Sequence, residues 1–184
     1  MIRLSHVTAG YPEKKVLDDL SLAFPDTGAV AVMAPSGYGK TTLLRVLAGL
    51  KAIDTGEISG LENKKISVLF QEDRLLPWLT AQKNVELVSN SEKAEYWLRQ
   101  MEIPDISQMP HAMSGGMQRR VALARAMAFG GDILLLDEPF KGLDDALRKR
   151  IAERIRGVFP STVLSVHDAA EADLMGAKII QLDQ

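Results

Sequence analysis

The 184-residue sequence contains no cysteine, so a disulfide framework and a thiolate metal site are both excluded. It has only three histidines, at positions 6, 111 and 167, and their separation argues against a His-rich metal cluster. No apolar run approaches the roughly 20 residues that a membrane-spanning helix needs. The first residues also lack the charged region and apolar stretch of a signal peptide. We therefore expect a cytoplasmic protein, whose contact with a membrane, if any, comes through a partner.

The chain has little excess charge of either sign. Its 22 Lys and Arg residues stand against 24 Asp and Glu residues, which leaves a net charge of -2. Such a balance gives no electrostatic footprint for nucleic acid and no polybasic patch for a membrane surface. Hydrophobic residues make up 46% of the chain and charged residues 25%, as in an ordinary globular protein. We expect one domain with a sizeable core.

Short apolar runs alternate with amphipathic segments along the chain, and this order predicts a mixed α/β domain. The run at 132–136 has no polar alternation, which is typical of a parallel strand buried on both faces. Ser91 is expected to cap a helix, and Gly49 to stop an earlier one. Residues 2–24 favour β-structure with a turn at 9–12, and residues 72–128 favour helices. We expect other strands at 28–33, 66–70, 162–166 and 178–182, and helices at 41–50, 91–101, 118–129, 144–158 and 169–175.

A glycine-rich segment lies between the expected strand at 28–33 and the expected helix at 41–50. It matches the phosphate-binding P-loop pattern, Gly-x-x-x-x-Gly-Lys-Ser/Thr, except that Ala34 replaces the first glycine. Glycines let backbone N–H groups point at phosphate oxygens, and the helix start adds its dipole. Lys40 would reach the β- and γ-phosphates, and the Thr41 hydroxyl would ligate Mg²⁺. The alternative, a glycine-rich turn with a chance lysine, is disfavoured by the flanking strand and helix. The segment consists of Ala34, Pro35, Ser36, Gly37, Tyr38, Gly39, Lys40 and Thr41.

An acidic pair, Asp137 and Glu138, ends the apolar run at 133–136. An apolar strand that delivers an acid at its carboxyl end is the Walker B arrangement. In that arrangement Asp137 would hold Mg²⁺ through its hydration shell, and Glu138 would polarise the attacking water. Alone, the pair is at least as well explained by a solvated acidic turn. The P-loop upstream favours the catalytic interpretation.

A second anion-binding helix start is predicted at Ser114, Gly115 and Gly116. Ser114 is a good N-cap, and the two glycines leave backbone N–H groups open. A well-capped structural helix is the alternative. In a P-loop ATPase, such a helix start can act in trans on the nucleotide of a sister subunit.

The segment 113–126 resembles the signature of ATP-binding-cassette (ABC) proteins. Met113 replaces the usual leucine, and the order of Gln and Arg after Met117 is slightly changed. Four more residues resemble ordered family motifs. Tyr11 resembles the A-loop aromatic residue that stacks on adenine, and Gln71 resembles the Q-loop glutamine that senses γ-phosphate and Mg²⁺. Asp144 resembles the aspartate at the end of the D-loop, and His167 resembles the switch histidine.

Simpler interpretations of single residues stay open at this point. Tyr11 could be a half-buried surface tyrosine, and His167 could be a structural histidine at a strand end. Lys141 lies where the family usually has a small residue, and the sequence offers no reason for it.

The resemblance implies a P-loop NTPase cassette with a RecA-like parallel-sheet core. It also implies an N-terminal antiparallel β subdomain and an inserted α-helical subdomain. A single domain would span residues 1–184, with the catalytic core at 1–71 and 127–184 and the helical signature subdomain at 72–126.

The resemblance also implies ATP and Mg²⁺ as cofactors and a set of site residues. The Mg²⁺ ligands would be Thr41, Gln71 and Asp137. The catalytic residues would be Glu138, His167, Gln71 and Lys40. The nucleotide-binding residues would be Tyr11, Pro35, Ser36, Gly37, Tyr38, Gly39, Lys40, Thr41 and Thr42 of one subunit, with Ser114, Gly115 and Gly116 of another.

By resemblance, the chain is an ATPase that acts in membrane transport. Two cassettes, expected as a homodimer, would pair head to tail with each ATP between the P-loop of one and Ser114–Gly116 of the other. Hydrolysis would drive solute import through a membrane permease, which places the cassette at the inner face of the cell membrane. A solute-binding protein would complete the transporter, and no nucleic acid is expected.

The segment 71–78 resembles importers of nitrate, sulfonate, taurine and thiamine-precursor compounds. In that family the helical subdomain after the Q-loop forms a groove for the coupling helix of the permease. Leu75, Leu76 and Trp78 would then either contact the permease or fill the core of the subdomain, and the sequence leaves both open.

Three other functions compete with this interpretation. The main one is a degenerate cassette that binds nucleotide with little turnover, for which Ala34 and Met113 are the only support. Intact Lys40, Asp137, Glu138 and His167 argue against it. An ABC ATPase of DNA repair or translation would carry long coiled-coil insertions or tandem cassettes. A small-molecule P-loop kinase would lack the Ser-Gly-Gly signature.

Overall fold

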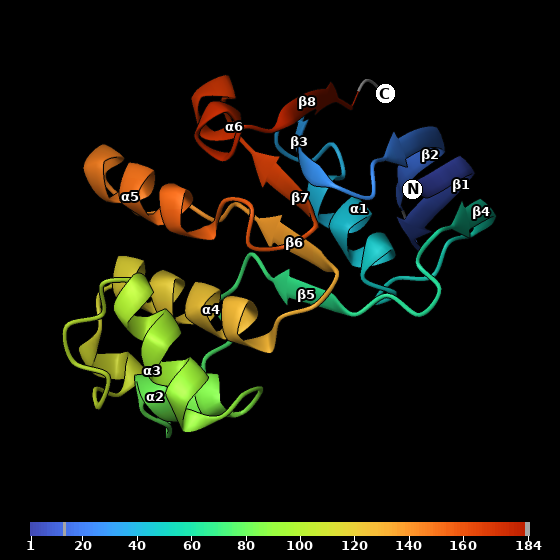
Figure 1. Cartoon of the computed structure of the whole chain (residues 1–184). Helices are drawn as coiled ribbons and strands as arrows, with labels where there is room; N and C mark the ends of the chain where they lie inside the picture. The colour runs from blue at the N-terminus through green and yellow to red at the C-terminus, as the bar shows by residue number, and fades with distance from the viewer. Residues whose placement is uncertain (13, 183–184) are drawn as a thin grey trace.

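The computed structural model describes residues 1–12 and 14–182, which form two sheets and the helices around them (Figure 1). The smaller sheet is antiparallel, with strand order β2-β1-β4. Its strands are β1 (Ile2–Tyr11), β2 (Lys14–Phe24) and β4 (Thr55–Ser59). The expected β-rich start is confirmed. The expected turn at 9–12 is wrong at its first three residues, because pairing with β2 carries β1 through to Tyr11.

The larger sheet has five strands in the order β5-β6-β7-β3-β8. Every neighbouring pair is parallel, which confirms the α/β class. Parallel strands bring their carboxyl ends to one edge of a sheet, where α/β proteins bind ligands. The strands are β3 (Gly28–Met33), β5 (Ile66–Leu69), β6 (Ile133–Asp137), β7 (Ser161–Val166) and β8 (Lys178–Gln181).

Most helix ends follow local signals in the sequence. The Ser114 hydroxyl oxygen accepts a hydrogen bond from the Met117 N–H at 3.2 Å and so caps a long helix. Gly49, at φ 69°, ends the first helix in the left-handed conformation that glycine favours. The helices are α1 (Lys40–Leu47), α2 (Ala81–Glu86), α3 (Ser91–Gln100), η1 (Pro110–Ala112), α4 (Gly115–Phe129), α5 (Asp145–Ile155) and α6 (Ala169–Met175).

One expected cap is wrong. The residue that caps α3 is Asn90, whose side-chain oxygen accepts a hydrogen bond from the Lys93 N–H at 2.9 Å. Ser91 is the first residue of the helix. Both side chains can cap a helix, and Asn90 has the extended backbone that an N-cap requires.

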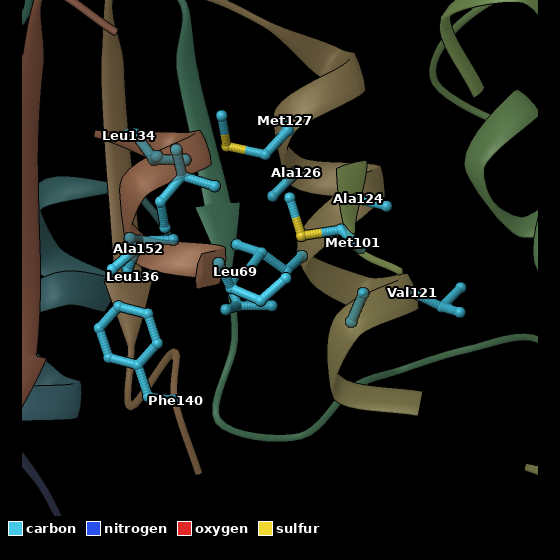
Figure 2. Close-up of a cluster of buried hydrophobic side chains, with 14 of the residues drawn as sticks. Leu69, Met101, Val121, Ala124, Ala126, Met127, Leu134, Leu136, Phe140 and Ala152 are labelled. Carbon is cyan, nitrogen blue, oxygen red and sulfur yellow. The ribbon is translucent and has the colours of Figure 1, made fainter. Parts of the chain in front are cut away.

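Two hydrophobic clusters lie on opposite faces of the parallel sheet. Leu134 and Leu136 of β6 face one cluster, in which Figure 2 shows Met127 of α4 beside Leu134. Ile133 and Leu135 of the same strand face the other cluster, which includes α1 and the antiparallel sheet. This alternation is the period of two that a strand buried on both faces requires. It fixes α4 on one side of β6 and α1 on the other.

The chain after β5 has no regular structure until Ala81. Leu75 packs against the cluster that Figure 2 shows, so for this residue the core interpretation holds. Trp78 is 69% exposed and Leu76 is half-buried. Among the described residues, no helix is both long and apolar enough to cross a membrane.

Candidate nucleotide site

Three predicted motifs leave the parallel sheet at the same edge. The P-loop follows β3, the acidic pair lies at the end of β6, and His167 directly follows β7. The sheet places β7 between β6 and β3, with Asp137 paired to Ser165 and Met33 paired to Val166. The fold therefore gathers segments that are far apart in the sequence.

The P-loop has the backbone that its glycines predict. Gly37 and Gly39 have φ values of 85° and 90°, which L side chains rarely adopt. A Cβ atom at Gly39 would also lie 2.9 Å from Leu17 of β2, so the antiparallel sheet packs directly against the loop. Ala34 is outside the positive-φ region, and this explains why alanine is tolerated there.

Lys40, the first residue of α1, is only 7% exposed. Its Nζ donates hydrogen bonds to the carbonyl oxygens of Ala34 at 2.6 Å and Pro35 at 3.4 Å. These bonds hold the ammonium group against the P-loop, where a phosphate would lie against the N–H groups at the start of α1.

Ser165 of β7 fixes both members of the acidic pair. Its hydroxyl donates to Oδ1 of the buried Asp137 at 2.7 Å, and its oxygen accepts from the Glu138 N–H at 2.9 Å. Glu138 has φ 51°, a left-handed conformation that costs a non-glycine residue roughly 1 kcal/mol or more. No motif in the sequence assigns Ser165 a catalytic or binding role. The signal that could have found it is the strand register, since Ser165 pairs with Asp137.

The Glu138 carboxylate lies between the His167 ring and the Lys141 ammonium group. Oε1 is 2.9 Å from His167 Nε2, and Oε2 is 3.5 Å from Lys141 Nζ. Only 12% of the Glu138 side chain is exposed. The structure thus brings Glu138 and His167, both predicted catalytic residues, into contact, and it gives Lys141 a partner that the sequence did not indicate.

Two adjoining cavities cover this edge of the sheet, with volumes of about 400 and 470 Å³. Both fall within the range of roughly 300–1,000 Å³ that small-molecule sites occupy. Ser36, Gln71 and Glu138 line both. The first cavity also has Tyr11, Lys14, Val16, Gly37, Gly39, Lys40, Thr41 and Thr42. The second also has Phe140, Lys141, Arg148, His167, Asp168 and Glu171.

Tyr11, at the rim of the first cavity, is 45% exposed. Its hydroxyl accepts a hydrogen bond from Arg45 Nη1 at 3.2 Å, and this bond lowers the pKa of Tyr11. The Lys51 ammonium lies 5.1 Å from the ring centroid. The two cations orient the ring and leave it accessible for stacking.

Five of the predicted nucleotide-binding residues line neither cavity. Pro35 and Tyr38 are exposed in the P-loop itself. Ser114, Gly115 and Gly116 lie at the start of α4, and the first two of them are exposed. One chain therefore brings together the P-loop and the acidic pair without the signature.

Thr41, Gln71 and Asp137 line a small cavity of about 10 Å³, whose other lining residues are Leu44, Arg45, Val68, Leu69 and Phe70. A space of this size holds roughly one water-sized sphere. Hydroxyl, amide and carboxylate oxygens are ligands that Mg²⁺ prefers, so the three residues fit the ion. No group of three or more His, Cys, Asp or Glu residues suited to a metal occurs in the described part of the chain. Phosphate oxygens and water would have to complete the coordination.

A family model described as ABC transporter matches residues 17–141 of the sequence. The match covers more than half of the chain and includes the P-loop, the signature and the acidic pair. The chain belongs to the ABC transporter family. ATP-binding cassettes of this family bind and hydrolyse ATP, and this cassette is therefore an ATPase.

Relatives of this ABC cassette match over almost its whole length. The aliphatic sulfonates import ATP-binding protein SsuB of Delftia acidovorans is 37% identical over 98% of this chain and 79% of its own. The probable sulfate/thiosulfate import ATP-binding protein CysA of Chlorella vulgaris is 32% identical over 99% of this chain and 87% of its own.

A solved structure has the same fold as this ABC cassette. It is the ATP-binding cassette MJ0796 as a dimer in a post-hydrolysis state, bound to ADP and Pi. The TM-score is 0.90 at 28% identity, and the likeness covers 100% of this chain and 94% of the other. The P-loop NTPase cassette fold expected from the sequence is confirmed.

Proposed function

We propose that this ABC cassette is the ATP-hydrolysing subunit of a solute importer, and that two copies pair head to tail under a membrane permease at the inner face of the cell membrane. The observation that carries the proposal is an incomplete site. Lys40, Glu138 and His167 line the adjoining cavities, whereas Ser114, Gly115 and Gly116 line neither of them and the first two are exposed. A second copy would supply the missing signature. The dimer that MJ0796 forms with bound ADP and Pi supports this arrangement.

The residues support phosphoryl transfer to water, in which positioning and charge neutralisation do most of the catalysis. Lys40 and the P-loop amides would bind the β- and γ-phosphates. Glu138, held by its backbone and paired with His167, would orient the attacking water. Thr41, Gln71 and Asp137 would hold Mg²⁺, which neutralises phosphate charge when bound.

The start of α4 would complete the site in the second copy. Ser114 caps this 15-residue helix, whose first N–H groups and dipole favour an anion. ATP bound between two copies would contact the P-loop of one and the signature of the other, and its hydrolysis would separate them. The simplest pair is a homodimer.

A groove of about 470 Å³ between the end of α1, β5, α2 and α4 would receive a helix of the permease. Leu50 and Leu87, which help to line it, are 60% and 55% exposed. Apolar side chains left open to solvent are typical of a protein–protein contact. The importer names of the relatives support a membrane permease as a further partner and a sulfonate-like or sulfate-like solute. A solute-binding protein would complete the transporter.

The proposal is tested by measuring Mg²⁺-dependent ATP hydrolysis against protein concentration, for wild type and Glu138→Gln side by side. Wild-type activity should rise faster than linearly with concentration, because two chains form each site. Glu138→Gln should lower turnover by at least roughly 100-fold, the contribution of a general base. In that variant, ATP should still convert monomers to dimers on size-exclusion chromatography with light scattering.

Two results would contradict the proposal. One is hydrolysis by Glu138→Gln at the wild-type rate, which removes the role of Glu138. The other is strictly linear activity from a monomer that ATP does not convert to a dimer. Binding without turnover in wild type would point to a degenerate cassette or to a subunit that needs its permease, and adding the permease separates these two.

A further inference from the structure

Arg119 is a buried cation in the first half of α4, five residues after Ser114. Its side chain is 4% exposed, although arginine is almost never fully buried unless its charge is paired. It lies at the edge where β5 and β6 leave the parallel sheet, and its two terminal nitrogens bind the chain after each of these strands.

The first terminal nitrogen of Arg119 holds the chain that follows β5. Nη1 donates to the carbonyl oxygen of Phe70 at 2.6 Å and, more weakly, to that of Gln71 at 3.4 Å. It also lies 2.9 Å from Asp73 Oδ1, and this carboxylate balances the buried charge. Arg119 thus ties the first residues of the predicted Q-loop, Phe70 and Gln71, to α4 through their backbone carbonyl groups.

The second terminal nitrogen holds the chain at the end of β6. Nη2 donates to the carbonyl oxygens of Asp137 and Glu138, the latter at 3.0 Å. The Glu138 N–H donates to Ser165 from the other side. Side chains from two other elements therefore occupy both backbone polar groups of Glu138, the residue with the left-handed conformation.

We propose that Arg119 is a positioning residue that sets the backbones of Gln71 and Glu138 and ties both to the helix that carries the signature. The inference rests on the roles proposed above for these two residues. The planar guanidinium has donors in a fixed fork, so one side chain can hold two segments at a set separation. A lysine ammonium is a point charge and cannot span the same four carbonyl groups.

The position of Arg119 in α4 would let a movement of the signature reach Gln71 and Glu138. Val121, Leu123 and Ala124, which follow it in α4, are fully buried, so the helix is packed as a unit. A displacement of Ser114 by a second cassette would carry Arg119 with it. The carbonyl groups of Gln71 and Glu138 would follow, and the signature of one copy would adjust the hydrolytic residues of the same copy.

The test compares Arg119→Gln and Arg119→Lys with Arg125→Gln, a matched control on the same helix. Arg125 also binds backbone carbonyls, those of Asp73 at 2.7 Å and Arg74 at 2.8 Å, and contacts neither Gln71 nor Glu138. Turnover, KM and the ATP dissociation constant are measured for each folded variant, with Glu138→Gln assayed alongside.

Both Arg119 variants should lose at least about ten-fold in kcat with KM and ATP affinity changed by less than about two-fold, because a displaced group weakens the transition state without weakening binding. Arg125→Gln should stay within about two-fold of wild type in kcat. A structural role alone would lower the activity of both Arg119 variants and of the Arg125 control together, in proportion to the folded fraction.

Wild-type kcat in a folded Arg119 variant, or an equal loss in Arg125→Gln, would overturn the inference. If neither Arg119 variant folds, Asp73→Asn decides, because it removes the charge partner of Arg119 and should lower kcat selectively in the same way. Full activity in Glu138→Gln would instead overturn the proposed function. Loss of activity in Glu138→Gln together with wild-type kcat in Arg119→Gln would overturn only the role of Arg119.

Discussion

Tyr11 is the residue at which a stacking contact with adenine can be separated from polar binding. Its ring is accessible at the rim of the P-loop cavity, and its hydroxyl is engaged by Arg45. We predict that Tyr11→Phe binds ATP within about two-fold of wild type, because the ring is retained, whereas Tyr11→Ala binds roughly ten-fold more weakly. Isothermal titration calorimetry with ATP measures both. Equal affinities for the alanine and phenylalanine variants would show that the ring does not stack.

At this scale, the sequence predicts the residues whose chemistry a motif defines. Lys40, Thr41 and Glu138 were expected at one site, and the structure places them around adjoining cavities. Arg119 and Ser165 could not be found in this way. Their roles depend on which carbonyl, amide or carboxylate group lies opposite them across elements, and no local pattern encodes that.

The contact between α3 and α5 is the element-scale feature that pH can test. The Glu102 carboxylate, just after α3, accepts two hydrogen bonds from Arg150 of α5, at 2.9 and 3.0 Å. Arg154 of α5 forms an ion pair with the same carboxylate at 2.8 Å. The hydrogen bond from Arg150, with a smaller part from Arg154, holds the pKa of Glu102 below its ordinary value of 4.5. The folded state therefore favours the ionised carboxylate.

We predict that Glu102→Gln lowers the free energy of unfolding by about 1 kcal/mol at pH 7, the upper end for a partly exposed ion pair. The pair stabilises the fold fully above the unfolded pKa of about 4.5, and this stabilisation is lost as pH falls through the lower folded value. Wild type and variant should therefore converge in acid. Urea unfolding at pH 7 and at pH 3 measures both differences.

The control for this prediction is Glu95→Gln in α3 itself. Glu95 pairs with Arg99 one turn further along the same helix and is 43% exposed. Its substitution should change the unfolding free energy by only a few tenths of a kcal/mol. A loss as large as that of Glu102→Gln would mean that the removal of any ion pair in this region, and not the link from Glu102 to α5, explains the result.

Elements with strong local signals were predicted well, whereas the order in which the strands pair in the sheet was not predicted. The strand at 28–33 and the helix at 169–175 have the expected bounds, because an uninterrupted apolar run and a capping Asp168 mark them. The strand order β5-β6-β7-β3-β8 depends on crossovers and has no local signature. The boundaries at 71/72 and 126/127 of the expected helical subdomain stay a prediction.

In the whole molecule, the two halves of the proposed site do not share a cavity within one chain. In a symmetric pair, the P-loop half of each copy meets the signature half of its partner, so both sites form at once. Lys40 and Glu138 then belong to the same half-site, and Ser114 belongs to the half that the partner supplies. This division makes an assay with two inactive variants possible.

We predict that Lys40→Ala and Ser114→Glu are each inactive and that an equal mixture hydrolyses ATP. Random pairing makes half of the dimers mixed, and each mixed dimer has one intact site, so up to about a quarter of wild-type activity should return. Lys40→Ala mixed with Glu138→Gln is the matched control. Both changes lie in the half-site of their own chain, so neither site of the mixed dimer is intact and no activity should return. Recovery in the control, or none in the test mixture, would mean that each chain hydrolyses ATP with its own signature.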